Sequence, residues 1–329
     1  MDTVYLHLNA AMGDTLYLLA ACRAIKNKTG ASIIMLSQPH FSALARACPH
    51  ISEVWPVDSL NAEQHQCIQR AQAQGRLFDF THWAHALRPR HMIDAFLAQA
   101  GLEASAADKH LDLVIPESAH SAVDAFWQQH KLENAPVLLM HPNIGHPNRT
   151  WPQNNWHELA QMWLQTGWQV VFIGSNNNSE AGKSMAEAYP AGVINAIDRF
   201  SALETVALMQ RANMLVSCDS GPVMLAAATD IPVVALYSTV AAEHRLPFRY
   251  GEAGWRCMGI DLACSHGPCA RLLMNDVIFT TVLKRPFDVP TTQEFANWCV
   301  HKTPFRCLRQ YEPAMLYTQM VSFVLSLQE

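Results

Sequence analysis

Apolar and polar positions alternate along the first 116 residues in a way that predicts strands and helices in turn. Apolar runs at TVYLHLN (3–9), SIIMLS (32–37), VWPVD (54–58) and FDFTHW (78–83) are typical of strands. The stretches between them predict helices at residues 14–28, 41–48, 61–74 and 91–102. A short strand is expected at LDLVIP, residues 111–116. This alternation predicts a parallel sheet covered by helices.

The same alternation starts again after Asn134, Ala135 and Pro136. Strands are predicted at 137–142, 168–174, 214–217 and 232–237, and helices at 155–166, 180–189 and 201–212. We therefore expect an N-terminal domain over 1–134 and a C-terminal domain over 135–329, both α/β and Rossmann-like, facing each other across a cleft. The rhythm is lost beyond Gly251, but residues 315–327 predict a last amphipathic helix, a candidate to pack back on the N-terminal domain.

Composition narrows the class of protein. Half of the 329 residues are hydrophobic, 16% are charged and the formal net charge is −5, so we expect no nucleic-acid partner. Met1 leads almost directly into a strand pattern without a basic leader, and no apolar run reaches the length of about 18 residues that spans a membrane. We expect a soluble, cytoplasmic protein. Four of the nine cysteines lie in apolar segments typical of buried reduced thiols, namely Cys22, Cys48, Cys67 and Cys218.

A polar tetrapeptide interrupts two apolar runs in SCDSGPVMLAAATDIPVVALY, residues 217–237. Asp219 and Ser220 are good helix N-caps and Pro222 suits the first helical turn. A strand, a tight turn at Gly221 and a helix start together present backbone N–H groups that suit a phosphate. The alternative is an ordinary βαβ corner with a good cap.

The first strand–helix junction, LNAAMGDTLYLL, places Gly13 and Asp14 at the carboxyl end of the first strand, where ligands of such folds bind. Alternatively, Asp14 is a simple helix cap. The junction lacks G-x-G-x-x-G, which argues against a dinucleotide-dependent oxidoreductase.

Two further residues follow strands of the C-terminal half. Arg149 lies in the loop HPNIGHPNRTWPQNNW and would supply the fixed cation that a diphosphate requires; alternatively it is a surface arginine packed over the Trp151 indole. Glu180 follows IGSNNNS and would accept a hydrogen bond from a ribose or a base, or else cap a helix.

Taken in order, these motifs resemble the heptosyltransferases of glycosyltransferase family 9. The likeness rests on GD at the first helix start, N-R-T-W-P-x-x-x-W, G-x(5)-E, and D-S-G-P followed by LAAA-x-x-x-PVVALY. It covers most of the chain and is strongest from about Met140 to Pro247. The resemblance implies the GT-B architecture of two facing Rossmann-like domains in a bacterial enzyme. It also implies inverting transfer of heptose from ADP-heptose without a metal, and no D-x-D occurs in this sequence to hold one.

The resemblance also implies roles for individual residues. Asp14 would be the general base, Arg149 would face the diphosphate, Glu180 would contact the nucleoside, and Asp219, Ser220 and Gly221 would form the donor phosphate corner beside Gly13. One position departs from the family. Many members have histidine where Met224 stands, which puts the donor in question, because a thioether cannot bind a phosphate strongly. A family member with a different nucleotide-sugar donor and an inactive nucleotide-binding scaffold stay open as alternatives.

The acceptor side and the late cysteines carry the remaining hypotheses. THWAHALRPRHM follows a strand and offers basic residues for an anionic or sugar-containing acceptor, His82, His85, Arg88 and Arg90, unless it is a solvated loop. The acceptor classes are the lipopolysaccharide core, another glycan or glycolipid, or a protein, with peripheral membrane contact possible. Members of the family that modify proteins use late cysteines as an iron-bound finger, so an iron or zinc ion is expected at Cys257, Cys264, Cys269, Cys299 and Cys307, the alternative being separate buried thiols.

Overall fold

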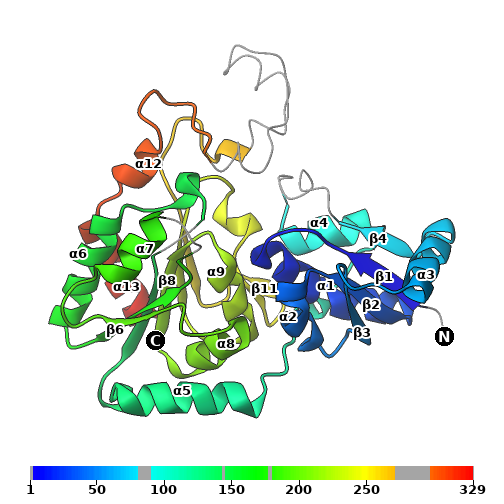
Figure 1. The fold of residues 1–329 in the computed structure, drawn as a ribbon. Helices are drawn as coiled ribbons and strands as arrows, with labels where there is room; N and C mark the ends of the chain where they lie inside the picture. Colours follow the sequence, from blue (N-terminus) through cyan, green and yellow to red (C-terminus); the bar gives the residue numbers. More distant parts are fainter. Residues whose placement is uncertain (1–2, 81–89, 143–144, 177–179, 271–296, 329) are drawn as a thin grey trace. The chain divides into compact units, whose positions relative to one another are not determined.

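The computed structural model describes residues 3–80, 90–142, 145–176, 180–270 and 297–328. The chain divides into two compact units (Figure 1). Unit 1 consists of residues 1–115 and 247–255, and unit 2 of residues 116–246 and 256–329. The predicted domain boundary at 134/135 stays a prediction.

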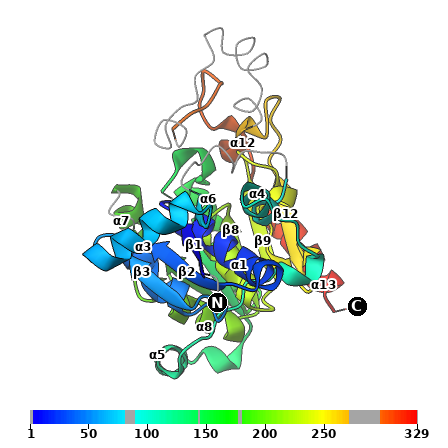
Figure 2. The same cartoon turned by 90° about the vertical axis from the view of Figure 1, so that its right-hand side faces the viewer.

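Unit 1 is a parallel sheet with helices against it. Among its described residues the sheet has the order β3-β2-β1-β4, and every pairing in it is parallel. The elements are β1 (Thr3–His7), α1 (Met12–Thr29), β2 (Ser32–Ser37), α2 (Ser42–Arg46), β3 (Glu53–Pro56), α3 (Ala62–Ala73), β4 (Leu77–Asp79) and α4 (Met92–Gln99). The short strands β10 (Phe248–Arg249) and β11 (Glu252–Ala253) also belong to this unit. Figures 1 and 2 show α1 and α3 beside the sheet.

Local chemistry explains where these helices begin and end. Helix α1 stops at Gly30, whose φ of 64° is the left-handed conformation that glycine adopts without strain. Helix α3 begins with a capping box, in which the Asn61 side chain accepts from the Gln64 backbone and the Gln64 side chain accepts from the Asn61 backbone. Both ends agree with the sequence prediction to within a few residues.

The strand predicted at residues 111–116 is wrong. This segment has no regular secondary structure, although Val114 N–H donates to the Ala47 carbonyl over 2.8 Å. The Asp112 side chain binds Arg23, His50 and His110, so side-chain bonds hold the segment where the sequence pattern suggested a ladder. Apolar alternation alone predicts a strand here, but among the described residues no strand pairs with this segment.

Unit 2 contains a larger parallel sheet. Its described strands have the order β12-β9-β8-β5-β6-β7, all parallel. The strands are β5 (Val137–His141), β6 (Gln169–Gly174), β7 (Ile194–Ile197), β8 (Met214–Cys218), β9 (Val233–Tyr237) and β12 (Cys257–Asp261). The helices are α5 (Glu117–Gln129), α6 (Gln153–Gln165), α7 (Glu180–Glu187), α8 (Ala202–Arg211), α9 (Gly221–Leu225), α12 (Arg306–Arg309) and α13 (Pro313–Ser326). The predicted α/β class with parallel sheets is confirmed.

Both faces of this sheet are buried, which explains its continuous apolar strands. Leu138 and Met140 point into a cluster with Trp156, Trp163 and residues of the neighbouring strands, whereas Leu139 is equally buried on the other face. Helices α5 and α8 pack together (Figure 1). Arg211 of α8 forms an ion pair with Asp124 of α5.

The sequence pattern does not indicate strands β7 and β12 of this sheet, and the last helix belongs to unit 2. Strands β7 and β12 form the two edges of the sheet, and β12 lies beside β9 (Figure 2). Helix α13 packs on α6, and its Leu316 and Met320 are buried in the core of unit 2. Its contact with the N-terminal domain stays a prediction. Among the helices described, none is long and apolar enough to cross a membrane.

Candidate functional site

The predicted donor residues of unit 2 meet at the carboxyl edge of its sheet. Arg149 follows β5 and Asp219 follows β8, and these two strands are neighbours. The Nη1 atom of Arg149 donates to the Asp219 backbone carbonyl over 3.2 Å and to the Asp219 carboxylate over 3.3 Å. Both side chains are mostly buried, with 25% of Arg149 and 12% of Asp219 exposed. The predicted corner therefore contains a fixed cation that an aspartate orients.

Packing below the corner holds the Arg149 loop in place. The Ser238 hydroxyl donates to the Asn148 carbonyl over 2.6 Å, which ties the loop to the residue after β9. Trp151 is fully buried, edge-to-face with Trp156, and its indole N–H donates to the Tyr311 carbonyl over 2.9 Å. The indole is thus part of the core and not a surface platform for Arg149.

The predicted N-cap at Ser220 has the expected extended backbone, but its hydroxyl makes no cap bond. Instead Ser220 Oγ lies 3.1 Å from His141 Nδ1 and 2.9 Å from Ser217 Oγ. Ser217 Oγ also lies 3.1 Å from His141 Nδ1 and donates to the Cys218 carbonyl over 2.8 Å. A closed network of hydroxyls and one imidazole therefore underlies the corner.

Two histidines near the corner are neutral at pH 7. Burial lowers the pKa of His141 to about 4. Burial, and then the positive charge of Arg149, lower the pKa of His146 to about 4, against the opposing pull of Asp219. The charged side chains of this corner are therefore Arg149 and Asp219, a nearly balanced pair.

Helix α9 is short and apolar. It has five residues, with Pro222 in the first turn as predicted. Met224 is 1% exposed and so belongs to the core. A five-residue helix carries a smaller dipole than a long one, so Arg149 and the corner backbone must supply most of any attraction for a phosphate.

Asp14 and Gly13 lie in the first turn of α1 in unit 1, directly after the loop that follows β1. The helix begins at Met12 with Ala11 as the N-cap, so Asp14 is not the capping residue. Its side chain is half-buried. Asp14 therefore lies in the first helical turn at the carboxyl edge of the sheet, and its role as the base stays a prediction.

The other predicted residues are only partly described. Glu180 is the first residue of α7, and its side chain lies outside the described residues, as do His82, His85 and Arg88. Arg90 is exposed and precedes His91, the N-cap of α4.

Four of the five late cysteines influence one another. Cys264 Sγ lies 3.3 Å from His301 Nε2, and Cys299 Sγ accepts from the Phe305 N–H over 3.3 Å. Burial, and then the thiols of Cys264, Cys307 and Cys299, raise the pKa of Cys269 to about 12. Cys257 lies within β12. Across the described part of the chain, no three His, Cys, Asp or Glu side chains stand as a group that could hold a metal ion.

All nine cysteines are free of disulfide bonds, and the expectation of reduced thiols concerned the four early ones. Of the four early ones, Cys22, Cys48 and Cys218 are buried, and Cys67 is half-buried.

Sequence reasoning missed three histidines, His141, His146 and His301. His141 ends an apolar strand, and Ser217 comes near the end of the neighbouring strand. Polar residues at the carboxyl ends of two neighbouring parallel strands are a usable signal, because those ends meet at one edge.

A family model named glycosyltransferase family 9 (heptosyltransferase) matches residues 67–253. The chain belongs to this family. The predicted membership, and with it the predicted enzyme class of glycosyltransferase, are confirmed. A curated family relative, lipopolysaccharide heptosyltransferase 2 of Salmonella typhimurium, is 32% identical over 108 residues, which cover 32% of this chain and 31% of that protein. The matched segment thus spans about a third of the curated relative.

Solved structures show the same fold over nearly the whole chain. The ADP-heptose lipopolysaccharide heptosyltransferase II of E. coli matches with a TM-score of 0.66 and 17% identity, covering 100% of both chains. The iron-containing dodecameric glycosyltransferase TibC of enterotoxigenic E. coli matches with a TM-score of 0.66 and 15% identity, covering 98% of this chain and 76% of TibC. The predicted GT-B fold class is confirmed.

Proposed function

We propose that this family 9 protein is an inverting, metal-independent glycosyltransferase that moves heptose from ADP-heptose to an acceptor hydroxyl. The observation that carries the proposal is the Arg149 guanidinium held by Asp219 at the carboxyl edge of the unit 2 sheet. A diphosphate leaving group needs a fixed cation there if no metal ion neutralises it. Donors named for relatives, such as the ADP-heptose of the E. coli enzyme, support this choice of nucleotide sugar.

In the proposed step, the Asp14 carboxylate removes the proton from an acceptor hydroxyl. The oxygen forms a bond to the anomeric carbon of heptose from the face opposite the diphosphate. The bond between that carbon and the diphosphate oxygen breaks, and ADP leaves with the electron pair. A carboxylate suits the first role because it accepts a proton only as the hydroxyl becomes acidic in the transition state. Asp14 is half-buried in the first turn of α1, at the carboxyl edge of the unit 1 sheet.

Arg149 stabilises the negative charge that develops on the departing ADP. Both of its bonds to Asp219 use Nη1, so the guanidinium has further N–H groups with which to bind phosphate oxygens. Gly13 and Gly221 allow the backbone to approach the donor. Glu180, at the start of α7, contacts the nucleoside in this proposal.

The proposed acceptor is the lipopolysaccharide core, with another glycan or a protein as the alternatives. The relatives that match in sequence act on lipopolysaccharide or lipooligosaccharide by name. His82, His85, Arg88 and Arg90 are proposed to bind this acceptor, in a bacterial cytoplasm where ADP-sugars are available and peripheral membrane contact is possible.

A panel of nucleotide sugars tests the proposal. ADP-heptose, ADP-glucose and UDP-glucose are titrated calorimetrically, and ADP release is followed with lipopolysaccharide core lacking heptose. We expect ADP-heptose to bind most tightly, and Asp14→Asn to keep this binding while losing transfer by at least about a hundredfold, because the amide keeps the shape and cannot take the proton. Asp58→Asn, at an exposed position of unit 1, is the matched control and should transfer normally. Transfer by Asp14→Asn at the wild-type rate would remove Asp14 from the mechanism. Tighter binding of UDP-glucose than of ADP-heptose would contradict the proposed donor.

We also propose a structural iron or zinc ion at the late cysteines, Cys257, Cys264, Cys269, Cys299 and Cys307. Their side chains form no metal-binding group in the described structure and would have to move together to bind it. The mutual influence of the last four thiols supports this, since a cation would relieve the cost of placing several thiolates together. We include iron beside zinc because TibC is an iron-containing glycosyltransferase. Metal analysis of the purified protein checks the proposal. Cys264→Ser should lose metal, the buried Cys22→Ser should keep it, and equal metal content in both variants would contradict the site.

A further inference from the structure

His141 is a buried, hydrogen-bonded histidine at the carboxyl edge of the unit 2 sheet. It ends β5, is 6% exposed, and its Nδ1 atom lies 3.1 Å from both Ser217 Oγ and Ser220 Oγ. His141 is neither the proposed base nor one of the residues predicted to contact the donor. A buried imidazole is costly unless it is hydrogen-bonded, so a histidine here requires a reason.

The count of available hydrogens favours one tautomer of this ring. Ser217 Oγ donates its only hydrogen to the Cys218 carbonyl, because a carbonyl can only accept. The Ser217 and Ser220 hydroxyls lie 2.9 Å apart, so Ser220 can donate its own hydrogen to Ser217 and complete this contact. Both hydroxyl hydrogens are then used. The contacts from His141 Nδ1 to the two oxygens need a third hydrogen, which only the ring can supply.

We infer that His141 is a positioning residue of the donor corner: its imidazole carries hydrogen on Nδ1 and, through Ser217 and Ser220, fixes the backbone from Cys218 to Gly221. This inference rests on the proposed function for its ligand, since the corner is where the ADP diphosphate is proposed to bind. Ser220 is the residue between Asp219, which orients Arg149, and Gly221, which begins α9. An untethered Ser220 would let both neighbours move.

The end of β6 keeps the ring in place. Gly174 has a φ of +117°, and a Cβ atom built there would lie 2.7 Å from His141 Nε2 and closer still to Cδ2. A side chain at 174 therefore collides with the imidazole. The glycine both tolerates this backbone conformation and leaves room for the ring.

The first test compares two side chains of nearly the same shape at position 141. In His141→Asn the amide N–H can replace Nδ1–H toward the serines, whereas His141→Leu offers no donor. Calorimetry with the full-length protein measures the affinity of each variant for ADP and for adenosine. We expect Leu to weaken ADP binding about tenfold, the effect of losing one good hydrogen bond, and Asn to restore it to within about threefold. Adenosine affinity should change less than about twofold in both, because it lacks the diphosphate.

Gly174→Ala provides a second, independent perturbation with a matched control. Gly167 also has a positive φ, +84°, but a Cβ there would meet nothing within 4 Å. Both substitutions therefore strain the backbone, and only Gly174→Ala displaces the ring. Weaker ADP binding by Gly174→Ala than by Gly167→Ala is expected, and equal affinities would count against a role for His141.

A measurement on the wild-type protein covers the case in which a variant does not fold. Imidazole ¹⁵N spectra of histidine-labelled protein report which ring nitrogen carries hydrogen. Among the 16 histidines, we expect the His141 ring to be neutral with its hydrogen on Nδ1 from pH 8 down to about pH 5, in keeping with its pKa of about 4. An Nε2–H or cationic ring would overturn the inference, as would unchanged ADP affinity in His141→Leu. A wild-type protein that fails to bind ADP while showing the Nδ1–H ring would instead refute the proposed donor.

Discussion

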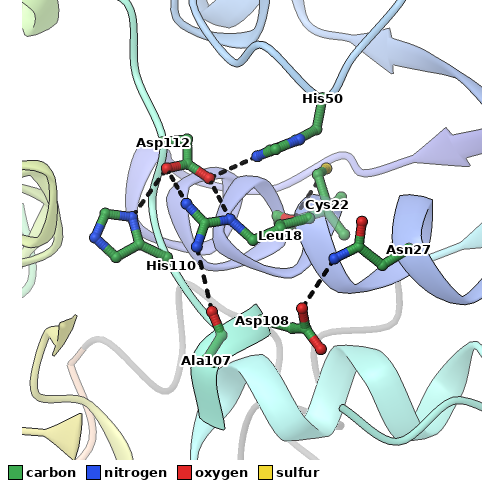
Figure 3. Close-up of polar contacts among 9 residues, drawn as sticks. Leu18, Cys22, Asn27, His50, Ala107, Asp108, His110 and Asp112 are labelled. Carbon is green, nitrogen blue, oxygen red and sulfur yellow. Dashed lines mark hydrogen bonds and ion pairs between the residues drawn. The ribbon is translucent and has the colours of Figure 1, made fainter. Parts of the chain in front are cut away.

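Replacing Asp112 by asparagine is expected to destabilise unit 1 by about 2 to 3 kcal/mol at pH 7, the contribution of hydrogen bonds to a charged group. The Asp112 carboxylate accepts from Arg23 Nε over 2.8 Å and Nη2 over 2.5 Å, and it lies 2.6 Å from His50 Nε2 (Figure 3). His110 Nδ1 is 3.1 Å away. These contacts join α1, the turn after α2 and the segment that leads to the end of unit 1. Asparagine has the same shape but half the acceptors and no charge.

The pH dependence follows from the carboxyl pKa. Burial alone would raise the pKa of Asp112, but hydrogen bonds from His110, Arg23 and His50 outweigh burial and hold it well below its usual range. A depressed folded-state pKa stabilises the protein fully above the unfolded pKa, about 3.9, and the stabilisation is lost as pH falls through the folded-state value. The difference between wild type and Asp112→Asn should therefore be constant from pH 7 to 5 and shrink below about pH 4.

Urea unfolding at several pH values measures the difference, and hydrogen exchange of peptides from α1 assigns it to unit 1. Asp108→Asn is the control, because Asp108 is only half-buried and its hydrogen bonds come from Asn27 (Figure 3) and from Ser105. It should leave stability nearly unchanged. A destabilisation by Asp112→Asn that stayed equally large at pH 2, or that was matched by Asp108→Asn, would refute the reasoning.

Two further predictions concern unit 2. Arg149→Ala should weaken ADP binding about tenfold or more and adenosine binding far less, because its partner is the phosphate charge; equal losses for both ligands in calorimetry would contradict this. Met224→His should lower the free energy of unfolding by about 2 to 4 kcal/mol, because the side chain is 1% exposed and an imidazole there is buried, while Met224→Leu should cost less than about 1.5 kcal/mol. A thermal melt unchanged by histidine, together with tighter ADP binding, would place position 224 at the phosphates instead.

Most elements could be predicted because their apolar pattern and their caps agree. Strands β5 and β8 are continuous apolar runs, as a sheet buried on both faces requires, and Gly30 ends α1 where the pattern stops. The strand predicted at residues 111–116 is wrong because an alternating pattern does not by itself provide a neighbouring strand to pair with. Strand β12 was missed because Cys257–Asp261 is too short and mixed to stand out, and it is a strand only through its pairing with β9.

The site was predictable in its charged residues and not in its supporting ones. Arg149 and Asp219 lie in loops that follow strands, where sequence alone indicates binding, and the fold brings them together. His141 and Ser217 lie within the strands, where each looks like the end of an apolar run. Their contact spans 76 positions of sequence and depends on β5 and β8 being neighbours, which only the sheet order reveals.

The balance of charge at the donor corner shows why such supporting residues matter. Arg149 is already paired with Asp219, and His141 and His146 are neutral at pH 7, so the corner offers little net charge to a diphosphate. Affinity in such a site must come from geometry, because groups that are held in place before binding lose little conformational entropy when the ligand arrives. Asp219 holds the guanidinium, and His141 holds Ser220. The buried Met224 fits the same design, since it anchors α9 in the core and leaves the polar contacts to residues that follow β5 and β8.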